Sequence, residues 1–235
     1  MTRVVISQPM LFPWVGFLEQ VRLADVYVHL DDAQFSKGSF TNRVQIKTAN
    51  GIKWLTIPLD GVKLGCQIRD VRAMDDDWRT RHLSLLKHAY AGSPYLDQML
   101  GIVTQCYTNA SNSVSEISFR SLQVTWDYFG LRPKLVLTSS DMNVPGSGSD
   151  RVLEIVRALG GDTYITGHGA LKYLDHELFA SHGIRVEYLD YSKIPYEQLH
   201  GDFTPFVSSL DLVANCGVRG QSVIQSGTKY WKELV

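Results

Sequence analysis

The stretch that decides the fold is residues 3–32, "RVVISQPMLFPWVGFLEQVRLADVYVHLDD". Its first part, residues 3–9, is mostly apolar and predicts a buried strand, which ends at Pro9 because proline cannot donate to a sheet ladder. Residues 26–30, "VYVHL", predict a second strand rich in β-branched and aromatic side chains. A helical pattern lies between the two, so the stretch is a βαβ unit, which implies a parallel sheet with a right-handed crossover.

The segment between these strands carries the signals of an amphipathic helix. Pro13 suits the first turn, where a missing N–H costs nothing. Phe17, Val21 and Ala24 recur at a spacing that places them on one helical face.

The rest of the chain divides into a hairpin, a helical part and a second α/β part. Residues 44–58 alternate apolar and polar side chains around Asn50-Gly51, which is a strong hairpin signal. From residue 75 to about residue 130 the pattern is helical, and Gly130 is a C-cap. Strands and helices then alternate in the order strand 133–140, helix 149–161, strand 162–167, helix 175–184 and strand 185–191.

These patterns predict an α/β fold with a central, largely parallel, Rossmann-like sheet. A β-hairpin is attached to this sheet, and the helices of about 75–130 form an insertion that covers one side. We expect residues 1–235 to form a single α/β domain, because no repeat or low-complexity linker interrupts the chain.

The composition argues against several classes of protein. Hydrophobic residues make up 44% and charged residues 20% of the 235 residues, with a net charge of −1. No basic face is available for a phosphate backbone, so a nucleic-acid partner is not expected. No apolar run approaches the roughly 20 residues of a membrane span, and no signal peptide is evident. Three scattered cysteines fit a cytoplasmic protein.

Polar side chains follow four of the predicted strands, at the point where each strand ends. Because ligands of parallel sheets collect beyond the carboxyl ends of the strands, we expect these side chains to line one pocket. The candidates for catalysis are His168, Asp31 and Asp32. The candidates for substrate binding are Gln8, Lys37, Asn42, Arg43, Asp150 and Arg151.

Each candidate also has a structural interpretation. Aspartates favour strand ends because they bind local backbone amides, and Arg43 could pair with Asp31 or Asp32. A single histidine is usually structural, although the glycines on both sides of His168 favour close approach of a ligand. The loop "GSGSDR" lacks the residues of a phosphate-binding loop, and its Ser149 suits a helix cap. The histidines show no metal-ligand spacing, so neither a metal nor a cofactor is expected.

The motifs together resemble the WbqC-like protein family. The first motif of that family, QPxxFPxxGxF, corresponds here to residues 8–17, and its second, DDxxFxKxxxxNR, corresponds to residues 31–43. Later similarities are "LTIPLDG", "SDRVLEIVRALGGDTYITG", "YLDHELFASHGIRVEYLDY" and "SSLDLVANCG". Many relatives carry a lysine near the position of Leu171 and a residue other than histidine at position 168.

The resemblance implies a bacterial cytoplasmic protein associated with O-antigen and other specialised-metabolite gene sets. It implies a transferase that moves an acyl or aminoacyl group, glycyl among them, onto an amine of an amino sugar or a similar small molecule. An acyl or peptidyl carrier protein would be the donor. Direct attack by the amine needs a base and oxyanion donors but no enzyme nucleophile, which suits the unpromising cysteines.

A second similarity is to the nucleotidylyltransferase-like layout of pantothenate synthetases. Trp14 and Phe17 stand where that layout has the two histidines of an HxGH motif. Indole and phenyl rings cannot stabilise a nucleotide's phosphates, so adenylyl transfer would be lost while a strand-end pocket remains. Two alternatives to acyl transfer stay open: a non-catalytic protein that binds a sugar nucleotide or metabolite, and a nucleotide-activating enzyme with a degenerate motif.

Overall fold

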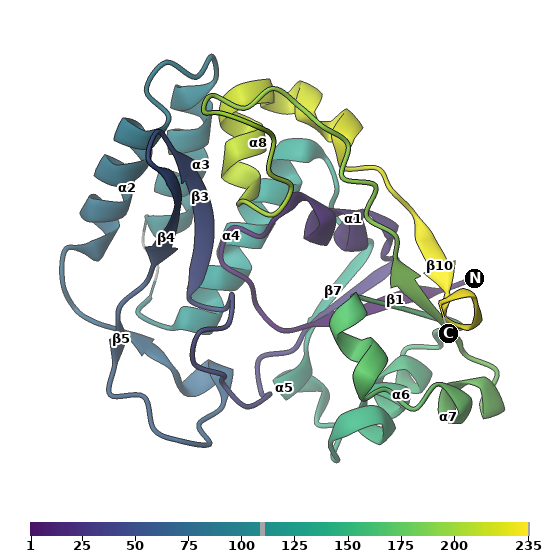
Figure 1. Ribbon diagram of the computed structural model, residues 1–235. Helices are drawn as coiled ribbons and strands as arrows, with labels where there is room; N and C mark the ends of the chain where they lie inside the picture. Colours follow the sequence, from purple (N-terminus) through teal and green to yellow (C-terminus); the bar gives the residue numbers. More distant parts are fainter. Residues whose placement is uncertain (109–110, 235) are drawn as a thin grey trace.

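The computed structural model describes residues 1–108 and 111–234. Among these residues, six strands form a central sheet in the order β10-β9-β8-β1-β2-β7 (Figure 1). The neighbouring strands pair in parallel, except that β10 runs antiparallel to β9. The fold is therefore mixed α/β with a largely parallel sheet, as predicted. Its strands are β1 (Arg3–Ser7), β2 (Val26–His29), β7 (Leu135–Thr138), β8 (Thr163–Thr166), β9 (Arg185–Leu189) and β10 (Thr228–Tyr230).

The predicted βαβ unit is present at the centre of this sheet. Strand β1 pairs with β2 in a register that places Val4 beside Val26 and Ile6 beside Val28. Helix α1 (Val15–Leu23) connects the two strands. From β2 the order continues outward to β7, and the chain then returns to the other side of β1 with β8. The strand order therefore reverses between β1 and β8.

The two faces of the sheet are covered by different helices. Val5 and Tyr27 pack into one apolar cluster with α1 and α4 (Val114–Phe129). Their neighbours in the strands face the other way and pack with α6 (Gly148–Ala158) and α7 (His176–Ser181). Figure 1 shows α1 and the green helices α6 and α7 on opposite sides of the sheet. Strands buried on both faces explain why the sequence shows continuous apolar runs here.

The hairpin and the helical part also form as predicted. Strand β3 (Arg43–Thr48) pairs with β4 (Gly51–Thr56), and Gly51 takes a φ of +92° at the turn. A small pair, β5 (Leu59–Asp60) and β6 (Arg72–Ala73), follows. The helices are α2 (Trp78–Ala89), α3 (Leu96–Tyr107) and α4, which ends at Gly130 in the left-handed conformation. Residues 109–110 of the predicted helical range lie outside the described residues.

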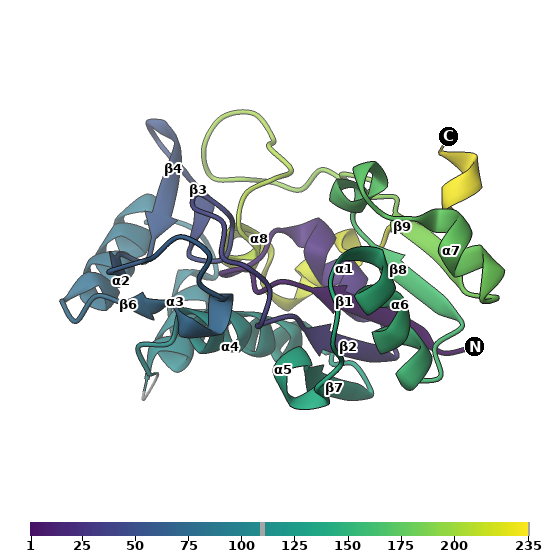
Figure 2. The same cartoon turned by 90° about the horizontal axis from the view of Figure 1, so that it is seen from below.

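Other elements were not predicted: α5 (Ser139–Met142), α8 (Ser209–Cys216) and β10. Between β9 and α8 runs a long irregular segment, residues 190–208, which passes from β9 toward the hairpin (Figure 2). The ammonium of Lys47 on β3 holds this segment by donating to Gln198 Oε1 at 2.8 Å and to the carbonyl oxygens of Gly201 and Asp202. These contacts order backbone that has no ladder of its own.

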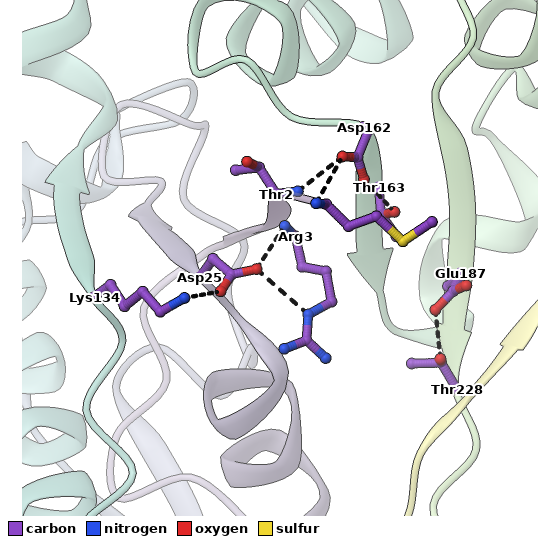
Figure 3. A network of polar contacts seen from close by, with 9 residues as sticks. Thr2, Arg3, Asp25, Lys134, Asp162, Thr163, Glu187 and Thr228 are labelled. Atoms are coloured by element: carbon purple, nitrogen blue, oxygen red, sulfur yellow. Dashed lines mark hydrogen bonds and ion pairs between the residues drawn. The ribbon is translucent and has the colours of Figure 1, made fainter.

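Carboxylates tie down the amino-terminal edge of the sheet (Figure 3). Asp25 accepts hydrogen bonds from the backbone N–H of Arg3 at 2.9 Å and from Lys134 Nζ at 2.9 Å, which together hold its pKa at about 2. Asp162 accepts from the backbone N–H of Thr2 at 2.8 Å. The carboxylates at this edge therefore have a structural role. In the described part of the chain, no helix is long and apolar enough to cross a lipid bilayer.

Candidate ligand cavity at the switch in strand order

A cavity of about 800 Å³ opens beyond the carboxyl ends of the parallel strands. It is lined by Ser7 and Gln8 at the end of β1, by Thr166 and His168 at the end of β8, and by Asp190 after β9. These residues flank the place where the strand order reverses, which is where ligands bind in open α/β sheets. The position agrees with the rule from which the strand-end candidates were predicted.

Aromatic side chains form one wall of this cavity. Trp14 at the start of α1 lies 5.0 Å from Tyr191 and 5.7 Å from Phe206, measured between ring centroids, and both pairs meet edge to face. Lys193 Nζ lies 5.5 Å from the centre of the Phe206 ring. Tyr191, Lys193 and Phe206 all belong to the irregular segment 190–208, so that segment and α1 close the cavity together.

Gly16 explains how Trp14 reaches this position. A β-carbon at Gly16 would come within 2.0 Å of the indole ring of Trp14. The ring therefore lies across the first turn of α1, over the one residue that has no side chain. The glycine of the first sequence motif is required by this close packing, which the helical backbone conformation alone would not demand.

His168 begins the short helix η2 (His168–Lys172), and its ring lines the cavity. Its Nε2 lies 2.8 Å from the carbonyl oxygen of Leu189. A carbonyl oxygen can only accept, so Nε2 carries the proton, and Nδ1 of the neutral ring keeps a lone pair. Within the described residues Nδ1 forms no hydrogen bond. The backbone thus orients the ring through Nε2, and Nδ1 is the atom that can accept a proton.

Asp31 and Asp32 lie in a separate, closed network beside α5. Asp31 is 7% exposed and accepts from Ser139 Oγ at 3.1 Å, from Ser140 N at 3.1 Å and from Ser140 Oγ at 2.8 Å. The side chain therefore satisfies donors at the beginning of a helix, which is a common use of aspartate. Neither Asp31 nor Asp32 lines the cavity that contains His168.

Arg151 at α6 completes this network. Its two terminal nitrogens donate to Asp32 Oδ1 at 3.0 Å and Oδ2 at 2.6 Å, and both side chains are only 14% exposed. Burial opposes ionisation of Asp32, but the hydrogen bonds from Arg151 and Ser139 outweigh it and lower the pKa. The carboxylate is a charged partner in a bidentate pair, which leaves it a weak proton acceptor.

Lys37, Asn42 and Arg43 line a different, smaller cavity of about 340 Å³ beside the hairpin. Asn42 is buried and donates from Nδ2 to the carbonyl oxygen of Ile57 at 3.0 Å, which holds the end of the hairpin. Arg43 donates from Nε to the carbonyl oxygen of Gly38 at 3.0 Å and stacks over Trp54 at 4.2 Å. Two of these three side chains thus have structural partners.

The predicted candidates therefore fall into three places, and the expectation that all of them line one pocket needs correction. Gln8 and His168 share the large cavity, whereas Asp32 pairs with Arg151 and Asp31 accepts hydrogen bonds from Ser139 and Ser140. Asp150 is exposed in the first turn of α6 and lines neither cavity. The physical reason is that acids and cations at strand ends pair with each other when helix starts bring their partners within reach. Lys37, Asn42 and Arg43 lie at the hairpin cavity.

The cysteines do not offer a nucleophile at the large cavity. Burial raises the pKa of Cys106 to about 12 and also raises the pKa of Cys216. Cys66 is half-buried, and none of the three lines the cavity. In the described ranges, no group of three or more histidine, cysteine, aspartate or glutamate side chains could hold a metal ion.

Sequence reasoning missed most of the cavity wall. Gln20, Lys193, Tyr191 and Phe206 line it but stand in a helix interior or an irregular segment, where no strand end marks them. The signal that was available is the FPxxG motif, since a glycine in the first turn of an amphipathic helix indicates close packing. It pointed to Trp14 but not to the segment that packs on it.

Comparison with known proteins places the chain in a family. The profile of the WbqC-like protein family matches residues 8–223, and the chain belongs to this family. The uncharacterised protein Rv1507c of Mycobacterium tuberculosis is 27% identical over 228 residues, which are 96% of this chain and 98% of that protein. No solved structure matches the chain.

Proposed function

We propose that this protein is a transferase that moves an acyl or aminoacyl group, glycyl among them, onto the amine of a small acceptor such as an amino sugar. The observation that carries the proposal is His168, which lines the large cavity and whose Nε2–H is held by Leu189, while Nδ1 makes no hydrogen bond within the described residues. Of the three predicted catalytic residues, only this one combines an open proton-accepting atom with a place in the cavity. Asp31 and Asp32 are positioning groups for α5 and α6.

The reaction would proceed by direct attack. The acceptor's ammonium gives one proton to His168 Nδ1, and its nitrogen then forms a bond to the carbonyl carbon of a thioester. The carbon–sulfur bond breaks, the His168 imidazolium returns its proton to the departing thiolate, and the attacking nitrogen releases its second proton to solvent as the amide forms. The thiol stays on the donor, which we propose to be a carrier protein's pantetheine arm. Gln8 and Lys193 both line the cavity, and we propose them as donors to the tetrahedral oxyanion. The lack of a cysteine at the cavity supports a scheme without an acyl-enzyme.

We further propose that the sheet is the nucleotidylyltransferase-like core expected from the sequence, adapted to this purpose. The reversal of strand order between β1 and β8 supports this relationship. Trp14 and Phe17, which replace the two histidines of that layout, both line the cavity. Aromatic rings favour the flat face of a ligand over its phosphates. Nucleotide activation is therefore the weaker alternative, and calorimetry with ATP should detect no heat of binding.

The test is a product assay with a matched pair of variants. Glycyl-S-pantetheine and a series of amino sugars, free and UDP-linked, are incubated with the protein, and mass spectrometry detects the amide. His168→Ala should lower the rate about 10²- to 10⁴-fold, the usual contribution of a general base. Asp150→Asn, which changes an exposed carboxylate outside both cavities, should keep the wild-type rate.

Three outcomes would contradict the proposal. An acyl group trapped on Cys66, Cys106 or Cys216 would make the reaction a ping-pong transfer through the enzyme. Unchanged turnover in His168→Ala would remove the proposed base. If the amino sugars bind to the wild type but no amide forms from this donor or from acetyl-S-pantetheine, the protein is the non-catalytic binding protein of the first alternative.

A further inference from the structure

The side chain of Gln20 is a buried amide that faces the large cavity. Gln20 lies in the interior of α1, is 6% exposed and lines the cavity wall. Throughout the described part of the chain, its amide has no hydrogen-bond partner within the protein, and its polar atoms are not among the fully buried atoms that lack one. The amide therefore opens to the cavity, where a ligand group can replace the solvent that hydrogen-bonds it.

Gly167 keeps the place of this amide open. A β-carbon at Gly167 would lie 3.2 Å from Gln20 Nε2, closer than ordinary packing allows. The φ of Gly167 is −90°, a value that any residue can adopt. A side chain at position 167 would therefore push the Gln20 amide by a few tenths of an ångström, and glycine leaves the amide in its present place.

The surroundings of Gln20 favour an uncharged ligand group. Thr166, which precedes Gly167, is buried and lines the cavity, as does Tyr164. Of the charged side chains at the cavity, Asp190 is paired with Lys229 at 3.0 Å, and Lys193 lies over Phe206 on the irregular segment. An amide both donates and accepts, and an unpaired ion beside it would lose its hydration without compensation.

We propose that Gln20 is a specificity-determining residue that hydrogen-bonds an uncharged polar group, a hydroxyl or a carboxamide, on a ring-bearing ligand. The flat face of that ring contacts the aromatic wall of Trp14, Tyr191 and Phe206. This inference rests on the proposed function only in placing the acceptor in the same cavity. It adds that the acceptor presents a neutral donor–acceptor group to α1, away from its reacting amine.

The test uses three small aromatic probes that differ in charge: benzamide, benzoate and benzylammonium. Each is titrated to millimolar concentration into ¹⁵N-labelled protein. The side-chain NH₂ signals of Gln20 are assigned by their disappearance in Gln20→Met. Benzamide should shift these signals, and benzoate and benzylammonium should leave them in place, because only the amide probe can pair with Gln20 without burying a charge.

Variants separate recognition from structure. Gln20→Met should weaken benzamide binding about fivefold, the worth of one hydrogen bond. It should also leave Tm unchanged, because the amide forms no hydrogen bond with any described residue and methionine has a side chain of similar length. Gly167→Ala should weaken benzamide binding in the wild type and have no further effect in Gln20→Met. Gln123→Met, a half-buried glutamine of α4 outside both cavities, is the matched control.

Four results would overturn the inference. Three concern binding: absence of a benzamide-induced shift at Gln20, equal binding of benzoate, or a Gln20→Met variant that binds benzamide like the wild type. The fourth is a large fall of Tm in Gln20→Met, which would make the residue structural. None of these results depends on turnover. The binding data can therefore fail while His168-dependent transfer is observed, and the product assay can fail while Gln20 still discriminates the probes.

Discussion

Two groups of polar side chains follow β2 and β8, the strands on either side of β1, at the same edge of the sheet, and they differ in how completely they are hydrogen-bonded. After β2, Asp31 and Asp32 accept from Ser139, Ser140 and Arg151, so that few of their lone pairs are free. After β8, His168 has one ring nitrogen bound to backbone and the other open to a cavity. Both groups carry the same sequence signal, polar residues at a strand end.

The difference shows what distinguishes a structural cluster from a site. Asp32 and Arg151 neutralise each other, and their partners come from helix starts that pack on the sheet. His168 and Gln20 retain hydrogen-bonding capacity that no described residue satisfies. Free capacity at the wall of an 800 Å³ cavity is therefore a better indication of ligand binding than charge at a strand end.

The largest expected effect on stability comes from breaking the Asp32–Arg151 pair. Arg151→Met leaves the Asp32 carboxylate, 14% exposed, without its cation, and should lower the free energy of unfolding by about 3 kcal/mol. Urea unfolding measures this loss. The double variant Asp32→Asn with Arg151→Met should recover most of it, because the uncompensated charge is then gone. A single variant as stable as the wild type would show that the pair contributes nothing.

Acid should lower the free energy of unfolding by a smaller amount, through a histidine that lies near Asp31. His29 ends β2 two residues before Asp31, and burial lowers its pKa to about 4. An unfolded histidine has a pKa of about 6.5, so between pH 6.5 and 4 the unfolded state takes up a proton that the folded state refuses. The free energy of unfolding should therefore fall as the pH falls through this window, on the order of 2 kcal/mol for this residue.

Two measurements check the acid prediction. The pH dependence of urea unfolding should become shallower in His29→Gln, while His88→Gln, which changes an exposed histidine, should keep the wild-type slope. If His29→Gln does not fold, the ring proton shifts of His29 in the wild type give its pKa directly. A value near 6.5 would contradict the prediction.

The smallest effect on stability is expected from substitutions of exposed residues at the carboxyl edge of the sheet. His168 is exposed and Asp150 is exposed, so His168→Ala and Asp150→Ala should each change the free energy of unfolding by less than about 0.5 kcal/mol. Urea unfolding of the two variants beside Arg151→Met makes the comparison direct. A loss of 2 kcal/mol or more in His168→Ala would mean that its bond to Leu189 stabilises β8 against β9 and that this residue is structural too.

Local patterns were sufficient for much of the fold. The apolar runs around Val5 and Tyr27, with the helical face of Phe17 and Val21 between them, determine the βαβ unit, because burial on both faces requires continuous apolar strands. Gly51 places the hairpin turn for a local reason, its positive φ. In contrast, β10 and α8 depend on docking against β9 and α3, and nothing within a short window encodes such docking.

The sequence by itself determined the parallel sheet, the edge at which ligands would collect, and His168 and Gln8 as residues at that edge. Only the tertiary structure decided that Asp31 binds two serines and that Asp32 pairs with Arg151. It also decided that Gln20 and segment 190–208 complete the cavity wall. The physical reason is how far apart along the chain the interacting residues lie. Strand and helix patterns are fixed by neighbours a few residues away, whereas pairing and exposure depend on groups brought together from distant parts of the chain.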